Sequence, residues 1–503
     1  LTDEPQQIEH FNYKQELNRK LTLPSILGLS FSVMSIPLGI STTMYTGLID
    51  GGAVTIFYGW IIVFLMSLCV AMSLGEMSGK YPSAGGIYHW SYIFANSKYN
   101  LITSFYCGWL LLIGNWTMCV SNLFSGAQFI LSIFGIIDTT YHPHSLVTLF
   151  VFFLLVLICA IINLKFSKHL DRINKVCIYW TIYTVLIIDI LLMIFSPRFN
   201  DLKSIFTSFD SSRSGWPAPI AFIIGFQQGA YTFQGFNLIP SMSDEVKAPE
   251  KNITKGMIYS VIIAGLTGII FIIPLLTILP ELALLLDEES NILPIEVIFK
   301  ISSNSLIVTL LFVILICGTI IIGGIGVFTV ASRSVYSLSR DNGIPFSKFW
   351  NQVSINNNEN DEEGDGDYSI IPKNGIYLTT IILIASGIFS LFSTSAFNAF
   401  MGSAINCLTV SNILPILSSI LNKRVKLKGS YFRLRSLGYM INVLSVFWSF
   451  FLLIVLSCPP RIPVNFITMN YTSLIFVLTL MFISLLYVVY GKNHFHGPLV
   501  DGN

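Results

Sequence analysis

Charged residues are scarce in this chain, and that scarcity is the first constraint on its fold. Asp, Glu, Lys and Arg make up 11% of the 503 residues, hydrophobic residues make up 53%, and the mean hydropathy is +0.71. Soluble domains usually carry about 25% charged residues, so this composition excludes an ordinary soluble globular protein. The formal net charge of +1 gives no sign of a nucleic-acid partner.

The chain also lacks the residue patterns that are typical of disulfide frameworks, metal sites and ATP-binding sites. Its eight cysteines lie in long apolar stretches, with only Cys458 near the end of one, so neither a disulfide framework nor a metal cluster is indicated. No Walker-type lysine motif occurs, which excludes an ATP-driven pump of that kind. We therefore expect no enzyme activity, no resident cofactor and no bound metal.

Long apolar runs dominate what is present. Each meets the roughly 20 residues needed to cross about 30 Å of hydrocarbon as a helix. The runs cover residues 21–49, 51–75, 99–137, 145–164, 176–197, 214–243, 256–280, 301–332, 374–421, 436–460 and 462–491. All are free of charge except 176–197, which contains Asp189. Because 374–421 is long enough for two helices, the sequence predicts an all-α polytopic membrane protein with twelve transmembrane helices.

The basic residues are divided unevenly between the connecting segments. If the amino terminus is cytosolic, 23 of the 28 Lys and Arg residues fall on the cytosolic side of the predicted helices. The exceptions are Arg198, Lys203, Arg213, Lys300 and Arg461. Because such a bias sets the orientation of membrane proteins, we expect both termini to be cytosolic.

Two of the apolar runs contain helix-breaking residues. Pro37 and Gly39 interrupt the first run, and Gly235 interrupts the run at 214–243. An unwound backbone inside a bilayer must bond to protein, water or a ligand, so two such breaks at matched positions indicate a substrate site near the midplane of a secondary transporter. The alternative is that Pro37 only kinks its helix.

The spacing of the runs predicts one membrane domain with an internal repeat. Five helices are an odd number, so a second group of five starts on the opposite face and gives inverted symmetry. The expected divisions are a cytosolic segment 1–20, a transporter domain 21–491 with repeats at about 21–197 and 214–421 and two extra helices at 436–491, an acidic disordered cytosolic loop at 353–368, and a cytosolic tail 492–503.

Several motifs resemble those of a known superfamily. GEMSGKYPSAGGIY from Gly75, SMSDEVKAPEKNI from Ser241 and SRDNGIPFSK from Ser339 are similar to signatures of the amino acid, polyamine and organocation superfamily. Within it, IFTSFDSSRSGW, STSAFNAF, MNYTSLIF and FHGP most resemble the fungal amino acid and choline transporter family, which includes γ-aminobutyrate, choline and polyamine permeases.

The resemblance implies a leucine-transporter-type fold that holds its solute between the two broken helices. Freed amides and carbonyls at the breaks would bond a zwitterion or a small amine. Family resemblance also places Tyr231 where choline and γ-aminobutyrate permeases usually have tryptophan, and Asn237 where they usually have aspartate. Aromatic side chains could line the site for a cation. The candidate substrate-binding residues are Ser35, Ile36, Gly39, Ile40, Ser41, Tyr106, Trp109, Tyr231, Phe233, Gln234, Phe236 and Asn237.

Ion coupling has few candidates in the sequence. Asp189 is an acidic residue inside an apolar run, and such residues are functional candidates in membrane proteins; hydrogen bonding within the bundle is the alternative. Aligning on Arg172-Ile173-Asn174 places Thr181 where many proton-linked members of the superfamily have lysine. Thr329 and Ser332 could coordinate a cation together with carbonyls of the first broken helix, although such hydroxyls often bond their own helix instead.

Charges on the cytosolic side suggest a gate. Glu76, Asp244 and Glu245 fall on the same predicted side as Arg333 and Arg340, and ion pairs that form only when this side is closed would bias alternating access. We expect Glu245 and Arg333 to be the closest pair. The alternative is that these are solvated loop charges.

Taken together, these features predict a secondary active transporter of a small nitrogenous solute, such as an amino acid, γ-aminobutyrate, choline or a related amine. Its partners would be that solute, the lipid bilayer and, for coupling, a co-transported proton. Of the plasma membrane and the vacuolar membrane, we expect the protein in the plasma membrane. A nutrient sensor that keeps a transporter fold without transporting is the alternative.

Overall fold

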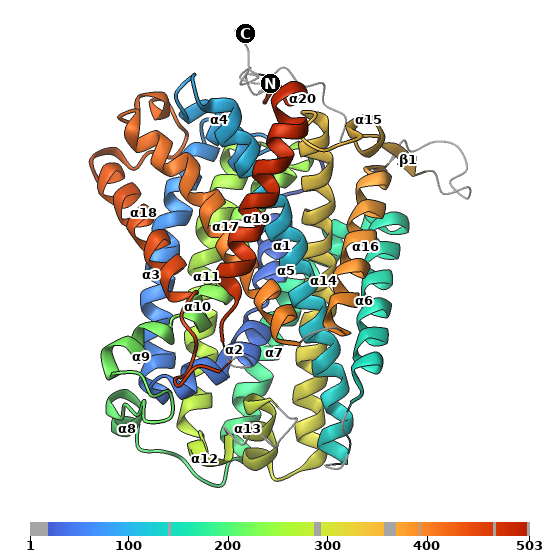
Figure 1. Ribbon diagram of the computed structural model, residues 1–503. Coiled ribbons are helices and arrows are strands. Elements are labelled where there is room, and N and C mark those ends of the chain that lie inside the picture. Colours follow the sequence, from blue (N-terminus) through green and yellow to red (C-terminus); the bar gives the residue numbers. More distant parts are fainter. Residues whose placement is uncertain are drawn as a thin grey trace, which may run out of the picture.

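The computed structural model describes residues 19–138, 141, 143–285, 293–356, 369–391, 394–465 and 469–499. Within them the chain forms a bundle of long helices, with α4, α15 and α20 at one end and α8, α12 and α13 at the other (Figure 1). We call these the α20 end and the α13 end. Among the described residues, eleven helical segments are long and apolar enough to cross a membrane, which confirms the all-α polytopic class.

The long elements follow the apolar runs. They are α1 (Leu23–Met34) with α2 (Ile36–Ile49), α3 (Gly52–Ser78), α5 (Asn100–Ile137), α6 (Ser145–Lys165), α7 (Leu170–Phe195), α11 (Pro249–Thr277), α14 (Leu306–Arg340), α16 (Lys373–Ile388), α17 (Thr394–Leu421), α18 (Gly438–Val455) and α19 (Thr472–Leu486). As expected, 374–421 divides into two helices.

Shorter elements connect and interrupt these helices. They are α4 (Ile87–Phe94), α8 (Leu202–Thr207), α9 (Ala218–Ile224), α10 (Gln227–Thr232), the 3-10 segment η2 (Phe236–Glu245), α12 (Leu282–Leu285), α13 (Pro294–Ser303), α15 (Ser347–Trp350) and α20 (Lys492–His494). The run at 214–243 is therefore built from α9, α10 and η2, each shorter than a membrane span. For this reason the count of twelve spans and the inverted repeat stay predictions.

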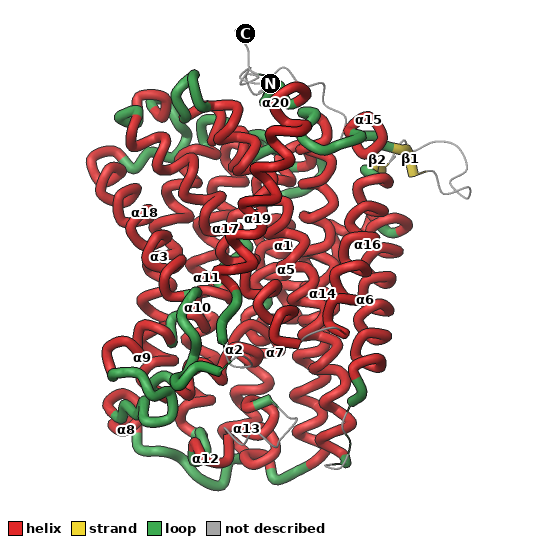
Figure 2. Tube along the Cα trace, in the orientation of Figure 1, coloured by secondary structure: helices red, strands yellow, loops and turns green. Residues whose placement is uncertain are grey.

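A small β-ribbon is the exception to the helical pattern among the described residues (Figure 2). Strand β1 (Ser354–Asn356) pairs antiparallel with β2 (Ser369–Ile371), with Ser354 opposite Ile371. The strands flank the acidic segment. Residues 357–368, most of the loop predicted to be disordered, lie outside the described residues, as do residues 1–18 and 500–503.

Glu296 is a carboxyl group buried at the α13 end. It lies on α13 and is 0% exposed. Ser132 Oγ of α5 donates to its carboxylate, and the Leu293 N–H donates to its Oε2 at 3.0 Å. Burial raises the pKa of Glu296 to about 7, although both hydrogen bonds lower it. The protonated form is therefore the one that the fold favours.

This burial predicts a pH-dependent stability. The unfolded chain ionises Glu296 near 4.5, so the stabilisation that its protonated form provides is lost as pH rises through the folded value of about 7. Between pH 6 and pH 8 this group should lower the free energy of unfolding by about 1.4 kcal/mol. Thermal unfolding of the detergent-purified protein at both pH values measures the change.

The matched control separates Glu296 from other groups. Glu296→Gln should lose part of the pH dependence, whereas Glu281→Gln, at an exposed position near the same end, should keep it all. Only part is expected to disappear because burial also raises the pKa of Asp50 to about 7. Identical pH dependence in the wild type and Glu296→Gln would contradict this account.

Candidate functional site

The first helix break lies between α1 and α2. Ser35 adopts the left-handed conformation with φ 37°, and Pro37 near the start of α2 has no N–H to offer. The Ser35 N–H donates to Phe31 O at 2.9 Å and the Gly39 N–H donates to Ser35 O at 2.8 Å. Both are ordinary helical bonds, so the interruption lies in the left-handed Ser35 and in the N–H that Pro37 lacks. At this point the carbonyl end of α1 meets the amide end of α2.

The second break lies between α10 and η2 and touches the first. Gly235 has φ 130°, a conformation that favours glycine, and a Cβ there would lie 2.7 Å from Val33 Cγ1. The Asn237 side chain holds this break, because its Oδ1 accepts from the Gly235 N–H at 3.3 Å and its Nδ2 donates to Asn412 Oδ1 at 3.2 Å. The two interruptions therefore lie at one level of the bundle.

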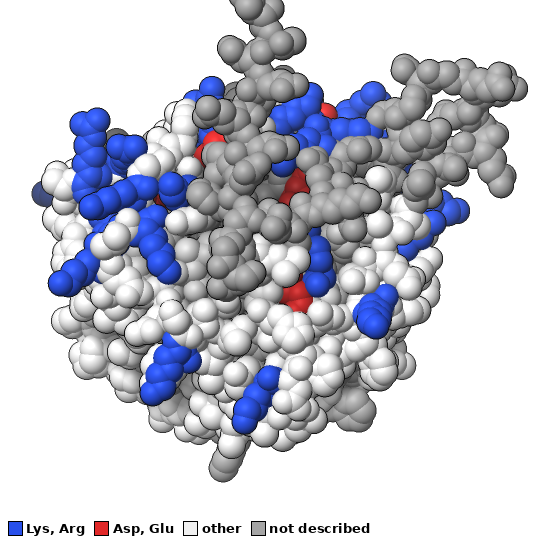
Figure 3. Space-filling view, turned by 90° about the horizontal axis from the view of Figure 1, so that it is seen from above, with Lys and Arg blue, Asp and Glu red and all other residues white. Residues whose placement is uncertain are grey.

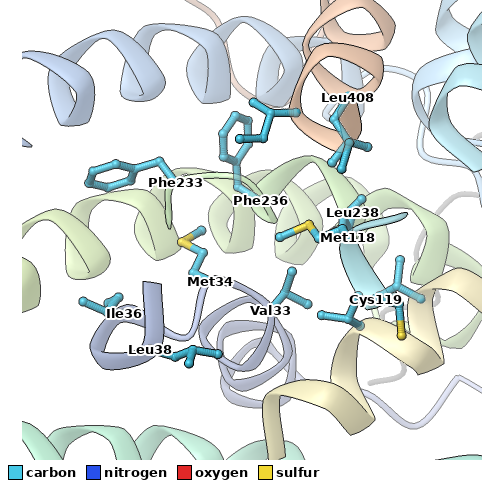
Figure 4. Packing of buried hydrophobic residues seen from close by; sticks show 14 of the residues in the cluster. Val33, Met34, Ile36, Leu38, Met118, Cys119, Phe233, Phe236, Leu238 and Leu408 are labelled. Carbon is cyan, nitrogen blue, oxygen red and sulfur yellow. The ribbon is translucent and has the colours of Figure 1, made fainter. Parts of the chain in front are cut away.

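Apolar side chains fill the contact between the breaks. Figure 4 shows Val33 and Met34 at the end of α1 near Phe236 of η2 and Met118 of α5. Phe236 is buried, as are Ile36, Gly39, Ile40 and Ser41 at the start of α2. Ser41 Oγ donates back to Pro37 O at 2.5 Å. These predicted substrate residues therefore lie in the packed contact between the two breaks.

Polar atoms of three helices lie close together beside the first break. Because Gly323 of α14 has no side chain, α14 packs closely on α1 here: a Cβ at this position would lie 2.7 Å from Ser32 O, 3.5 Å from Ser35 Oγ and 3.6 Å from Asn122 Nδ2. We call this group, formed by Ser35, Asn122 and Gly323, the niche. Ser35 Oγ and Asn122 Oδ1 are buried and have no hydrogen-bond partner among the described residues. Gln234 Oε1, next to the second break, is likewise unsatisfied within the described part of the chain. Such atoms are costly unless a ligand or water bonds them.

Sequence reasoning missed Asn122, although a signal was available. Asn115, Asn122 and Ser125 recur at helical spacing in the run at 99–137 and so place three polar side chains on one side of that helix. Asn115 of this group donates to Ser334 Oγ of α14 at 2.7 Å.

An open cavity of about 480 Å³ extends from this level. Its wall is made by α2, α5, α10, α17 and the segment joining α18 to α19. Figure 1 shows α2, α10 and that joining segment in the half of the bundle away from α20. Tyr231 lines it, and its hydroxyl meets Ser121 Oγ at 2.5 Å. The described residues that line it are all uncharged: Thr42, Thr43, Thr46, Ser121, Ser125, Gln227, Tyr231, Ala399, Gly402, Ile405, Leu456, Pro460, Met469, Asn470, Tyr471 and Thr472.

Three aromatic residues predicted to line the site pack elsewhere. The Phe233 ring lies 4.7 Å from that of Trp60 on α3, between their centroids. The Tyr106 hydroxyl donates to Ser484 Oγ of α19 at 2.8 Å, and the Trp109 Nε1–H donates to Gly343 O at 2.9 Å. Residues 106 and 109 face α19 because they are on a different side of α5 from Asn122.

The candidate coupling residues lie on two helices, Asp189 and Thr181 on α7 and Thr329 and Ser332 on α14. Asp189 on α7 is 7% exposed, and neither carboxylate oxygen has a hydrogen-bond partner in the described ranges. Thr181, on the same buried stripe of α7, lies beside Cys177, with 3.9 Å between Oγ1 and Sγ. Both residues remain candidates.

Thr329 and Ser332 do not face the carbonyls of α1, which corrects that expectation. Thr329 Oγ1 donates to Asn163 Oδ1 of α6 at 2.8 Å and to Ile325 O at 2.7 Å, and Ser332 Oγ donates to Thr329 O at 2.8 Å. The reason is helical phase, because glycines, Gly323 among them, occupy the face of α14 that meets α1.

Ion pairs close the bundle at the α20 end. Arg333 Nε donates to Glu245 Oε1 at 3.0 Å, so this expected pair is in contact. It is not the closest pair, because Arg340 Nη1 lies 2.9 Å from Asp244 Oδ2. Arg333 is 2% exposed and also bonds Asn163 Oδ1 at 3.4 Å. We call these two pairs the inner closure.

The segment before α1 reinforces the inner closure. The backbone N–H groups of Lys20 and Leu21 donate to Glu245 O at 2.9 Å, and the Lys247 N–H donates to Leu21 O at 3.0 Å. Leu21 and Val246 thereby form a parallel bridge. The end of η2 is thus tied both to α14 and to the segment that leads into the first broken helix.

Glu76 is not part of this closure, which corrects its expected role. Its carboxylate pairs with Arg424 and accepts from the Leu434 N–H at 3.1 Å, so it binds the segment between α17 and α18. The reason is tertiary: α3 ends beside that segment rather than beside α14.

Two of the sequence motifs meet in a buried polar cluster that the sequence did not reveal. Asp341 Oδ2, from the SRDNGIP motif, is 2.8 Å from His89 Nε2 and accepts from the Tyr88 hydroxyl at 2.9 Å. His89 Nδ1 lies 2.9 Å from Ser83 Oγ in the first motif. This cluster joins the segment before α4 to the end of α14.

Comparison with known proteins identifies the group to which this architecture belongs. The profile described as amino acid permease matches residues 21–483. The chain belongs to the amino acid permease family. Over 507 residues it is 38% identical to a polyamine transporter of Saccharomyces cerevisiae, covering 99% of this chain and 80% of that protein.

Further relatives are also named as permeases or transporters. An amino-acid permease of Arabidopsis thaliana is 28% identical, covering 98% of this chain and 95% of that protein. A choline transporter of Saccharomyces cerevisiae is 29% identical, and the match covers 95% of this chain and 83% of that protein. These relatives confirm the family resemblance seen in the motifs. The protein is therefore a multi-pass membrane permease, and its relatives are transporters rather than enzymes; their names give no support to the sensor alternative.

Proposed function

We propose that this permease carries a small amine with one or more protonated nitrogens. The observation that carries the proposal is the niche beside the first break, where Ser35 Oγ and Asn122 Oδ1 are buried acceptors without a partner among the described residues. An ammonium group has three donors and no acceptor, which suits such a niche. The name of the relative at 38% identity, a polyamine transporter, supports the same solute class.

The local electrostatics also favour a cation in the niche. The carbonyl end of α1 is the negative end of a helix dipole, and Ser32 O lies beside Gly323 in this niche. Neutral oxygens stabilise a cation less than a carboxylate does, but they cost less to desolvate when the solute leaves. A carrier that must release its solute on every cycle gains from this moderate affinity.

A zwitterionic amino acid is the second candidate. The first amides of α2 lie at the positive end of a helix dipole, which favours a carboxylate. The ammonium group of an amino acid would then occupy the niche near Asn122, while its carboxylate would face Gly39. The Arabidopsis relative, named as an amino-acid permease, supports this reading.

For the direction of transport we propose cytosolic termini in the plasma membrane. The excess of Lys and Arg in segments at the α20 end supports this orientation. The inner closure would then face the cytosol and the 480 Å³ cavity the outside. We also propose the repeats 21–197 and 214–421, since each contains one of the two broken helices.

Proton coupling through Asp189 is part of the proposal. Its carboxylate is buried on the stripe of α7 that also contains Thr181. A buried carboxyl without a partner in the described chain is a natural proton carrier, because protonation removes the cost of its charge.

A competition uptake assay tests the solute class. Cells lacking their own permeases would take up labelled putrescine in competition with γ-aminobutyrate, choline and alanine, with and without a pH gradient. We expect putrescine to compete best. Competition by alanine alone would favour the amino-acid candidate, and an absence of uptake of every solute would contradict the proposal.

Asn122→Leu is the companion variant. It removes an acceptor that we expect to bond the ammonium group, a bond worth roughly 1.5–3 kcal/mol, so uptake affinity should fall by roughly 10- to 150-fold. Asn442→Leu is the matched control, because Asn442 on α18 is another buried asparagine with unpartnered side-chain atoms in the described structure, but it is not on a helix that borders the niche. An equal loss in both variants would show a general effect of removing a buried amide.

A further inference from the structure

The segment between α17 and α18 forms a well-anchored surface loop. We call residues 421–440 the basic loop, since it contains six Lys and Arg residues between positions 423 and 435. Arg424 pairs with Glu76 of α3, Ser430 Oγ donates to Glu76 O at 2.7 Å, and the Tyr431 N–H donates to Gly79 O at 3.0 Å. These bonds fix the loop against the end of α3.

Three of its basic side chains are exposed and form no polar contact within the described part of the chain. Lys423, Lys428 and Arg435 are solvent-exposed, and their side chains form no hydrogen bond or ion pair with any described residue. Arg424, by contrast, forms an ion pair with Glu76. The loop therefore offers cationic groups outward from a rigid base.

The backbone at two of these residues is strained. Lys423 has φ 52° and Arg435 has φ 46°, in the left-handed region that glycine adopts without cost. Long basic side chains are thus held at positions where the fold alone would favour glycine. Strained positions of this kind concentrate at functional sites.

Exposed apolar side chains accompany the charges. Leu421 is 73% exposed, Val425 58% and Leu437 57%. They continue an exposed apolar stripe along α18, which is itself a candidate membrane span. The stripe consists of Tyr439, Met440, Val443, Phe447, Phe450 and Ile454. Because such a stripe faces hydrocarbon, the basic loop lies at the level of the lipid headgroups.

The charge pattern at the α20 end agrees with this placement. Lys and Arg side chains are prominent on that face, and acidic side chains are few (Figure 3). A soluble anion would require only the charges, whereas the exposed Leu421, Val425 and Leu437 require an apolar neighbour. Both requirements are met at once by a phospholipid.

We propose that the basic loop binds anionic phospholipid headgroups of the leaflet at the α20 end. Lys423, Lys428 and Arg435 contact the phosphate and carboxylate oxygens, while the apolar side chains enter the acyl boundary. This site is independent of the solute niche, which lies between α1, α5 and α14. Its occupant would hold the ends of α3, α17 and α18 to the membrane surface.

Lipid retention by the full-length protein tests the site. Native mass spectrometry would compare retention of phosphatidylserine with that of phosphatidylcholine for the wild type and for Lys423→Gly/Arg435→Gly. Each charge near a membrane surface is worth roughly fivefold in affinity, so the double variant should retain phosphatidylserine about 25-fold more weakly. Its thermal stability should be unchanged or higher, because glycine relieves the left-handed strain.

Controls make each outcome decisive. Lys251→Gln/Lys348→Gln removes two exposed charges outside the basic loop and should leave retention unchanged. Lys428→Gln, at an ordinary backbone position, should weaken retention about fivefold and serves if the glycine variant does not fold. Unchanged retention in the loop variants, an equal loss in the control, or displacement of the lipid by millimolar inorganic phosphate would overturn the proposal.

Discussion

Replacing Glu245 by glutamine should reduce solute uptake by roughly 150-fold or more, because removing one partner leaves the buried Arg333 without its counter-charge at a cost of about 3–5 kcal/mol. Arg333 is 2% exposed, and its contact with Glu245 exists in the closed arrangement of the α20 end. The cost therefore falls on one conformation of the cycle. Uptake per molecule of permease at the membrane, determined by quantitative blotting, is the measurement.

Two variants test whether the lost ion pair is the cause. Glu245→Gln/Arg333→Gln removes both charges and should recover part of the activity, since no charge is left buried. Lys175→Gln breaks a half-exposed pair with Asp171 and should have little effect. Wild-type uptake by Glu245→Gln would show that the inner closure does not control transport.

An inside-negative membrane potential should drive accumulation of the amine by roughly 50-fold per charge for each 100 mV, equivalent to about 2.3 kcal/mol. The physical reason is that every side chain lining the 480 Å³ cavity in the described part of the chain is uncharged, as are Ser35 and Asn122 in the niche. A cation bound there keeps its charge and moves it across the membrane. Proteoliposomes with a potassium gradient and valinomycin allow the potential to be set and the uptake measured.

The zwitterion is the internal control for this experiment. Alanine carries no net charge, so its uptake without a coupled ion should not respond to potential, whereas putrescine should respond with two charges. A pH gradient applied at zero potential separates any proton movement through Asp189. Uptake of putrescine that ignores the potential would mean that a counter-charge crosses with it.

The helices themselves were predictable because their cause is local. In hydrocarbon each backbone polar group must be satisfied within its own segment, so a charge-free run of sufficient length specifies a helix wherever it packs. The breaks were predictable for the same reason: Pro37 lacks an N–H, and Gly235 readily adopts a positive φ. The contact between Glu245 and Arg333 followed from opposite charges on the same predicted side.

The residues that the sequence placed wrongly or missed share a different cause. Tyr106, Trp109 and Asn122 all lie on α5, a helix that is apolar on most sides, so the sequence alone did not show which side faces α1. The same ambiguity misplaced Thr329 and Ser332 on α14. Glu76 forms an ion pair with Arg424, which is distant in sequence, because α3 ends beside the basic loop.

By itself the sequence determined the number of long apolar segments, the places where two of them break and the excess of basic charge at one end. These depend on composition and on the bonding capacity of single residues. The tertiary structure alone decided that Gly323 of α14 packs beside Ser35 and Asn122, and that Glu76 anchors the basic loop. Rotation of a helix about its axis is set by the neighbours against which it packs, and neighbours are a property of the whole fold.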